Sequence, residues 1–206
     1  MADLKLIDPC NRHLNYLRIS ITDRCNLKCL YCVPGDQIPR LSHDDILTYE
    51  EILRLVRIGI RLGISKIRVT GGEPLVRKGV YNFLTDLSGL EGLTDLSLTT
   101  NGVSLKANLG KIKAAGIKRI NISLDTHDRT KFEHITGFDL FGQVWQGIEM
   151  ALGMGFHPIK LNIVALNGIN DDELTDMAHL SFDYPLHIRF IEYMPIGESQ
   201  IGNGPL

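Results

Sequence analysis

The sequence lacks any apolar run that approaches the roughly 20 residues needed to cross a bilayer, so we expect no membrane span. Residues 1–5 contain no basic stretch that leads into an apolar core, which argues against a secretory signal peptide. An excess of one charge is also lacking, because 22 Lys and Arg residues stand against 24 Asp and Glu residues. Without a basic stripe, we expect neither nucleic acid nor a membrane surface as a partner. These absences predict a cytoplasmic protein.

Cysteine is scarce and unevenly placed. Only four cysteines occur in 206 residues, and three of them, Cys25, Cys29 and Cys32, fall within one short segment. In a reducing compartment such a group favours metal ligands over disulfides. A chain of this length buries about 70% of its unfolded surface when it folds, so it needs no metal for stability alone. We therefore expect a metal bound here to serve chemistry.

A regular alternation of strand-like and helix-like segments runs through the chain. The strand-like segments are residues 16–21, 66–70, 95–99, 119–124, 159–165 and 187–191. The alternation predicts an α/β fold with parallel strands and helices outside them, in one domain over residues 1–206. Six such units are fewer than the eight that close the common barrel, so we predict an open partial (β/α)6 barrel.

Two kinds of short signal mark the ends of the expected helices. Thr48 and Glu51 have the spacing of a capping box in front of a helical apolar pattern. Gly63, Gly116 and Gly155 each follow a helical segment and precede a strand-like one. Glycine at such a place predicts a left-handed residue that ends the helix.

The strand-like segments alternate apolar with polar residues and do not read as unbroken apolar runs. The polar members include Arg18, Ser20, Thr22, Arg68, Thr70, Asn121, Ser123, Asp125, Lys160 and Asn162. If the apolar faces pack under the helices, the polar faces meet in a common interior, which we expect to be a large polar cavity. A sheet open to water on one side is the alternative.

The segment after the first predicted strand reads CNLKCLYC and places cysteines at positions 25, 29 and 32. Three thiolates so close together can hold three corners of an iron–sulfur cluster and leave one iron open. A zinc site with a histidine as fourth ligand is the alternative. Zinc sites usually present cysteines in pairs, and His43 and His127 show no companion pattern, which favours the cluster. The lone Cys10 is more typical of a small apolar residue than of a ligand.

A second feature, TGGEP at positions 70–74, follows the second predicted strand. Gly71 and Gly72 allow a ligand to approach the backbone closely, and Glu73-Pro74 prevents immediate continuation into a helix. At the carboxyl end of a strand in a βα barrel, this loop would line the active-site rim. A tight structural turn without a ligand is the alternative.

Taken together, these motifs resemble those of the radical S-adenosylmethionine enzymes. The resemblance is greater still to the GTP 3′,8-cyclases of molybdenum cofactor biosynthesis, and it covers nearly all of the chain. The segments that carry it are LRISITDRCNLKCLYC, IRVTGGEPLVR, LTTNG, NISLDT, KLNIV and RFIEYMPIG.

The resemblance implies a set of cofactor ligands. Cys25, Cys29 and Cys32 would bind a [4Fe-4S] cluster whose open iron is chelated by S-adenosylmethionine. The residues implied to contact S-adenosylmethionine are Tyr31, Gly72, Ser123 and Met194. The chemistry would belong to the cofactor, while the protein supplies position and shielding.

The resemblance also implies that GTP is the substrate and that an external donor supplies an electron. The residues implied to meet GTP are Arg18, Arg68, Thr99 and Lys160. The three basic residues lie in the polar phase of their strands, where they could answer triphosphate oxygens. Without the resemblance, Arg68 and Lys160 would be read as salt-bridge partners, Ser123 as a strand hydroxyl and Met194 as a core residue.

The sequence departs from the family at its carboxyl end. Family members continue further, with three more cysteines for a second [4Fe-4S] cluster that holds the guanine and with a Gly-Gly tail. Four cysteines cannot supply that second cluster, so we expect a fragment, a truncated form or a degenerate relative that binds S-adenosylmethionine without completing the cyclisation. Alternatives are a radical enzyme for another substrate and a non-catalytic, zinc-stabilised barrel domain; a homodimer is one option for assembly.

Overall fold

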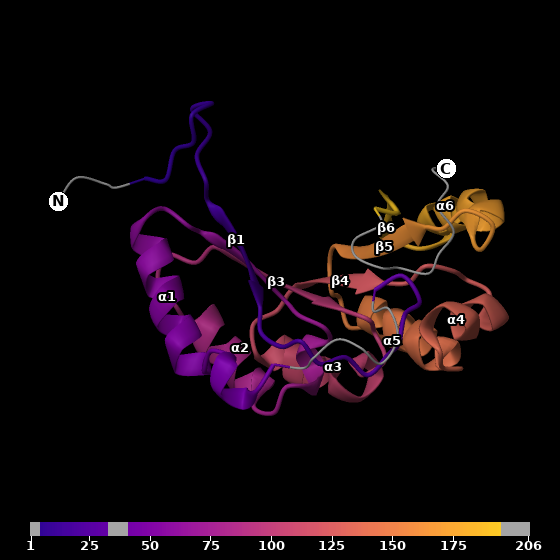
Figure 1. Ribbon diagram of the computed structural model, residues 1–206, viewed down its shortest axis with the longest axis horizontal. Coiled ribbons are helices and arrows are strands. Elements are labelled where there is room, and N and C mark those ends of the chain that lie inside the picture. The colour runs from indigo at the N-terminus through magenta and orange to yellow at the C-terminus, as the bar shows by residue number, and fades with distance from the viewer. Residues whose placement is uncertain (1–4, 33–40, 195–206) are drawn as a thin grey trace.

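The structure is a computed structural model that describes residues 5–32 and 41–194. Six strands form one sheet in the order in which they occur along the chain, and every neighbouring pair is parallel (Figure 1). The strands are β1 (Tyr16–Ser20), β2 (Lys66–Thr70), β3 (Asp95–Thr100), β4 (Arg119–Ser123), β5 (Ile159–Ala165) and β6 (Leu186–Glu192). β1 and β6 are the two edges, so the expected open partial barrel is confirmed.

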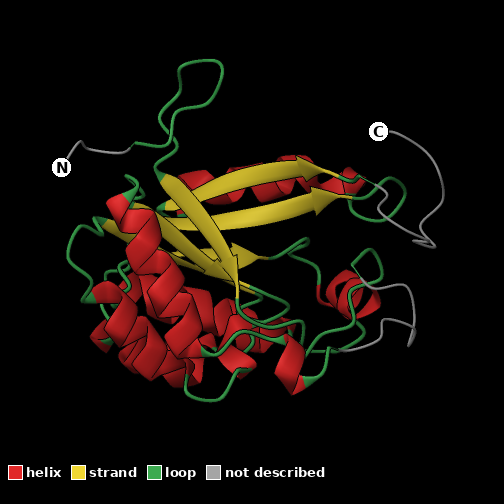
Figure 2. Cartoon of the chain, turned by 60° about the vertical axis from the view of Figure 1, so that its left-hand side comes forward, coloured by secondary structure: helices red, strands yellow, loops and turns green. Residues whose placement is uncertain are grey.

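Helices connect successive strands and cover one face of the sheet (Figure 2). The α-helices are α1 (Tyr49–Arg61), α2 (Val80–Ser88), α3 (Leu105–Ala114), α4 (Arg129–Thr136), α5 (Phe141–Gly153) and α6 (Leu174–Asp183). Short 3-10 turns are η2 (His43–Asp45), η3 (Pro74–Val76) and η4 (Asp171–Glu173). In the described part of the chain, no helix has the length and apolar character of a membrane span.

The predicted helix-end signals are confirmed. The hydroxyl of Thr48 accepts from the Glu51 N–H at 3.2 Å, and the Glu51 carboxylate accepts from the Thr48 N–H at 2.8 Å. Gly63, Gly116 and Gly155 have φ values of 98°, 84° and 77°. Because side chains at such φ values are strained, glycine is the residue that lets each helix turn into the next strand.

The apolar phase of the strands forms the core against the helices. Ile67, Leu98, Ile122 and Leu161 are fully buried there, and they meet apolar residues of α1, α2, α3 and α5 in one cluster. Burial of each such side chain stabilises the fold by about 1.5–3 kcal/mol. The core therefore fixes which face of every strand is left for the polar residues.

The polar phase of the strands forms the opposite face, and register brings its residues side by side. Arg18 pairs with Arg68 across β1 and β2, and Asn121 pairs with Lys160 across β4 and β5. Most of these side chains are half-buried, whereas those at the edge strands are exposed. The described residues thus have a polar face that is partly open to solvent.

Candidate functional site

The carboxyl ends of the strands bring the sequence motifs to one edge of the sheet. The cysteine segment follows β1, the Gly71-Gly72 turn follows β2, Asn101 follows β3 and Asp125 follows β4. This edge is where open α/β sheets place ligands. The parallel order of the strands therefore collects residues that are up to about a hundred positions apart in sequence.

The cysteine segment is held in place by backbone contacts to the end of α4. Lys28 N–H donates to the Thr136 carbonyl at 3.0 Å, and Leu30 N–H donates to the Ile135 carbonyl at 2.9 Å. Cys25 and Cys32 are exposed, and Cys29 is half-buried. The segment is thus fixed by its main chain, and its cysteine side chains are left available for ligation.

The three thiols influence one another electrostatically. Burial raises the pKa of Cys29, and the carboxylate of Asp125 and the charged forms of Cys32 and Cys25 raise it further. Burial and the same kinds of negative charge raise the pKa of Cys32. Thiolates are the metal-binding form of cysteine. Positive charge bound among the three sulfur atoms would therefore stabilise the thiolates and lower the raised pKa values.

The three cysteines fit the ligand set of an iron–sulfur cluster with one open iron. The cysteines of a four-iron cluster bind separate iron atoms, so their sulfur atoms stand apart. Three thiols on one anchored loop, close enough to raise each other's pKa, match that requirement.

The glycine turn after β2 allows another part of the chain to approach its backbone closely. A Cβ atom on Gly72 would lie 2.5 Å from the Arg24 carbonyl oxygen, and one on Gly71 would lie 2.7 Å from the Thr22 carbonyl oxygen. Gly72 N–H also donates to that Thr22 oxygen at 2.7 Å. The chain that enters the cysteine segment therefore packs directly against both glycines, and the predicted contact of Gly72 with a ligand stays a prediction.

Glu73 joins this turn to the end of β3, a role that sequence reasoning missed. The buried carboxylate accepts hydrogen bonds from Leu75 N–H at 3.0 Å, from the Thr100 hydroxyl at 2.9 Å and from Asn101 N–H at 2.7 Å. Burial raises the pKa of Glu73, and the three hydrogen bonds oppose that rise. Glu73 therefore links the carboxyl ends of the neighbouring strands β2 and β3.

Tyr31 is fixed to the ends of β4 and β5 through Asp125. The Tyr31 hydroxyl donates to Asp125 Oδ2 at 2.6 Å, and Val164 N–H donates to Asp125 Oδ1 at 2.8 Å. Burial raises the pKa of Asp125 to about 6, although both hydrogen bonds lower it. The half-buried Ser123 lies two residues before Asp125, to which Tyr31 is bonded. Tyr31 and Ser123 therefore lie near each other at the end of β4.

The predicted substrate residues share the polar face with two further arginines, Arg119 on β4 and Arg189 on β6. Burial lowers the pKa of Arg68, and the positive charges of Arg18, Arg119 and Arg189 lower it further. In a flat sheet, β2 and β6 would be about 19 Å apart, beyond the range of strong interaction in salt. The sheet of an open partial barrel is curved, so its polar face is concave and these charges lie within reach of one another.

Few carboxylates lie near these positive charges to form ion pairs with them. Arg119 forms a bidentate ion pair with Asp95, which includes a bond of 2.7 Å from Nε to Oδ1. Arg68 lies 5.5 Å from the centre of the Tyr16 ring, and Lys160 has its pKa lowered by burial and by Arg189, Arg119 and Arg68. Within the described ranges, neither Arg68 nor Lys160 forms an ion pair, whereas Arg119 does.

Three buried polar atoms on this face have no hydrogen-bond partner among the residues that the structure describes: Arg68 Nε, Thr99 Oγ1 and Asn121 Oδ1. Thr99 and Asn121 are register neighbours on β3 and β4. A buried polar atom without a partner costs about 1–3 kcal/mol, which a ligand with matching groups would offset. Arg68 and Thr99 belong to the predicted set, and Asn121 is an addition from the structure.

The remaining predicted residues are separated from this centre. Met194 is 65% exposed and lies two residues beyond β6 at the same edge of the sheet. Cys10 is exposed in the segment before β1, which is at the opposite end of that strand from the cysteine segment (Figure 1). The structure therefore leaves Cys10 outside the ligand set.

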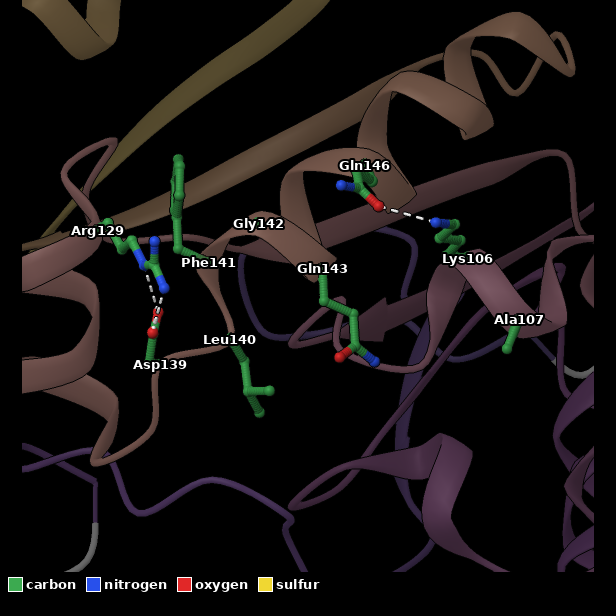
Figure 3. Close-up of a pocket in the computed structure, with 9 residues that line it drawn as sticks. All are labelled: Lys106, Ala107, Arg129, Asp139, Leu140, Phe141, Gly142, Gln143 and Gln146. Atoms are coloured by element: carbon green, nitrogen blue, oxygen red, sulfur yellow. Dashed lines mark hydrogen bonds and ion pairs between the residues drawn. The ribbon is translucent and has the colours of Figure 1, made fainter.

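A separate hollow of about 730 Å³ lies among α3, the start of α5 and the connection from α4 (Figure 3). Its charged side chains have partners of their own. Arg129 pairs with Asp139, and Lys106 donates to the Gln146 side chain at 2.8 Å. None of the residues that line it belongs to the predicted site.

A family model described as the Radical SAM superfamily matches residues 19–181 of this sequence. The chain therefore belongs to the radical SAM superfamily, in agreement with the cysteine segment, the glycine turn and the open parallel sheet.

Relatives with a more specific name are about half identical to this chain. The GTP 3′,8-cyclase of Moorella thermoacetica is 53% identical over 190 residues, which are 92% of this chain and 59% of that protein. The GTP 3′,8-cyclase of Petrotoga mobilis is 47% identical over 199 residues, or 97% of this chain and 62% of that protein. The chain thus spans about three fifths of the length of these relatives.

Solved structures with the same fold are more distant in sequence. SuiB of Streptococcus suis, in a structure bound to S-adenosylmethionine, has a TM-score of 0.73 and 16% identity, and the match covers 91% of this chain and 42% of that one. The enzyme anSMEcpe with bound AdoMet has a TM-score of 0.71 and 19% identity, over 92% and 52% of the two chains. At these identities the likeness concerns the fold alone.

Proposed function

We propose that this chain forms the catalytic core of a GTP 3′,8-cyclase. The reaction converts GTP to (8S)-3′,8-cyclo-7,8-dihydroguanosine 5′-triphosphate, the first step of molybdenum cofactor biosynthesis. The names of the half-identical relatives support this activity. The structural observation that carries it is the concave polar face, where the described residues place five basic side chains around the single carboxylate of Asp95.

Cys25, Cys29 and Cys32 would hold a [4Fe-4S] cluster on the anchored loop after β1. When bound, the cluster and S-adenosylmethionine together supply the radical that starts the reaction. The chain itself fixes the loop through the α4 contacts and through Glu73. We propose that Tyr31, Gly72, Ser123 and Met194 contact S-adenosylmethionine along the carboxyl edge, as the family resemblance implies.

The polar face would bind GTP next to that edge. Guanidinium and ammonium groups make charge-assisted hydrogen bonds with phosphate oxygens, and arginine does so in a bidentate manner. Arg18, Arg68 and Lys160 would meet the triphosphate, with Arg189 as a further candidate. Thr99 and Asn121 offer a donor and an acceptor on the neighbouring strands, and their unpartnered atoms point to a polar ligand on this face.

Assembly and surroundings complete the proposal. The reaction requires an electron from outside the chain, so an external one-electron donor is proposed as a transient partner. A substrate such as GTP is consistent with a cytoplasmic location. A homodimer stays a prediction.

Anaerobic reconstitution followed by two measurements tests the proposal. We expect a brown protein that bleaches with dithionite and releases 5′-deoxyadenosine from S-adenosylmethionine. A colourless protein with stoichiometric zinc would reject the cluster. Because the 206 residues hold too few cysteines for a second cluster, we expect little cyclic product from this chain by itself; efficient cyclisation would refute that part.

The substrate is tested by equilibrium dialysis of the reconstituted protein with GTP and with GMP. We expect GTP to bind at least about tenfold more tightly, since each added charge-assisted contact to phosphate contributes about 1.5–3 kcal/mol. Equal affinities for GTP and GMP would show that the basic residues of the polar face do not bind the triphosphate. A different substrate would then have to be sought.

A further inference from the structure

Asn101, directly after β3, turns its side chain toward the cysteine segment. Its amide nitrogen, Nδ2, donates to Asn26 Oδ1 at 2.7 Å and to the sulfur of Cys25 at 3.7 Å. Asn101 is neither a predicted ligand nor part of the predicted substrate set. It nonetheless joins the third strand to a cysteine that follows the first.

The direction of this amide is fixed by its other contacts. Asn101 Oδ1 accepts from Val103 N–H at 3.1 Å, and the backbone N–H of Asn101 donates to Glu73 Oε2 at 2.7 Å. A flipped amide would place its oxygen against the oxygen of Asn26 and the sulfur of Cys25. The geometry therefore requires an N–H group that faces the sulfur.

The Cys25 sulfur receives a second N–H group as well. Leu27 N–H donates to it at 3.4 Å, from two residues further along the segment. Hydrogen bonds to cluster sulfur atoms and the partners around metal ligands set reduction potentials. Such donors stabilise the reduced cluster more than the oxidised one, because reduction adds negative charge next to the N–H dipoles.

We propose that Asn101 is a positioning residue that orients Cys25 and raises the reduction potential of the cluster. The inference rests on the proposed function, since it requires a [4Fe-4S] cluster on Cys25, Cys29 and Cys32. It assigns Asn101 an electronic role in addition to its structural one: without its N–H group, the cluster would be harder to reduce.

The test is a redox titration of the reconstituted chain, followed by EPR of the reduced cluster. Asn101→Asp keeps the acceptor for Val103 and loses the donor, and Asn101→Ala loses the donor without adding charge. We expect the ratio of reduced to oxidised cluster at a fixed potential to fall by up to about tenfold in both variants, a shift of about 59 mV for a one-electron couple. The matched control Asn26→Ala removes the other acceptor of the same amide and should shift the potential less.

An unchanged potential in Asn101→Ala with full iron and sulfide content would overturn the proposal, as would an equal shift in Asn26→Ala. If neither Asn101 variant retains a cluster, pulsed EPR of the parent chain labelled with [15N]asparagine decides. A 15N coupling that persists in Asn26→Ala supports the contact, and its absence from the parent refutes it. A parent chain that forms no cluster at all would instead refute the proposed function.

Discussion

The loops at the carboxyl edge and the polar face of the sheet belong to one site, yet their buried polar groups are satisfied to different degrees. At the edge, Glu73 accepts three hydrogen bonds and Asp125 accepts two. On the face, Arg68, Thr99 and Asn121 each keep a buried atom without a partner in the described part of the chain, and positive charges lie close to one another.

The difference separates two tasks. Groups that already have their partners hold the cysteine segment and the glycine turn in position before any ligand arrives. Groups without partners lower the stability of the free chain and gain their hydrogen bonds only when a ligand binds. The carboxyl edge is thus rigid before a ligand binds, whereas the polar face recognises the ligand. Substitutions at the edge should therefore lower the free energy of unfolding, and substitutions on the face should lower the affinity for GTP.

The largest effect is expected from loss of a cysteine at the edge. Cys29→Ala should lower cluster content and 5′-deoxyadenosine formation by at least about 100-fold, because changes even to the partners of metal ligands cost 10–100-fold. Iron and sulfide assays with chromatography of the nucleoside measure both. Cys10→Ala is the matched control and should behave as the parent chain; loss of the cluster in this control would bring Cys10 back into the ligand set.

Replacement of the buried Glu73 at the carboxyl edge should destabilise the fold. Glu73→Gln keeps the shape but places an amide N–H group where the carboxylate accepts hydrogen bonds. We expect the free energy of unfolding to fall by about 3 kcal/mol, measured by urea denaturation of the cluster-free chain. The exposed Glu91→Gln should stay within about 0.5 kcal/mol of the parent. A Glu73→Gln variant as stable as the parent chain would show that the hydrogen bonds of Glu73 do not stabilise the carboxyl edge.

The same kind of charge-to-amide change on the face should have the opposite signature. Arg68→Gln should weaken GTP binding about 10- to 30-fold, since a charge-assisted contact to phosphate is lost. The free energy of unfolding should not fall, because a half-buried charge surrounded by like charges is removed. Arg57→Gln, on the exposed side of α1, is the control for both measurements. A destabilised Arg68→Gln variant with unchanged GTP affinity would reverse the assignment of the two regions.

The smallest effect is expected at Thr99. Thr99→Val removes an unpartnered hydroxyl with little change of shape, so the free energy of unfolding should rise by up to about 1 kcal/mol. GTP affinity should fall about fivefold if the hydroxyl contacts the substrate. Calorimetry and equilibrium dialysis, with the exposed Thr175→Val as control, measure the two quantities. Unchanged GTP affinity would remove Thr99 from the binding face.

Much of the fold could be predicted from local sequence alone. The predicted strands 66–70 and 159–165 agree with β2 and β5, the first, third and fourth differ by one residue at one end, and the sixth differs by one residue at each end. Where the first strand was expected to reach residue 21, Ile21 N–H still donates to Thr70 at 2.9 Å beyond the assigned end. Capping boxes, glycine ends and strand periodicity are properties of a few neighbouring residues, which explains their reliability.

The contacts that hold the site together could not be predicted in the same way. Glu73 sits in a glycine turn with no local sign that two of its three partners, Thr100 and Asn101, come from the end of β3. The partners of Asp125 come from the loop after β1 and from β5. Arg119 and Arg189 did carry a signal, because both fall in the polar phase of their strands. Their place became clear only once register put them beside Ser97 and Asn162.

The close fit of Gly72 against the Arg24 carbonyl oxygen has a practical consequence for protein engineering. Any side chain at this position would push the incoming segment away, so a library aimed at new substrates should keep codons 71 and 72 constant. Diversity belongs at positions 68, 99 and 121, where side chains have spare bonding capacity. Retargeted variants should then inherit the cofactor machinery unaltered.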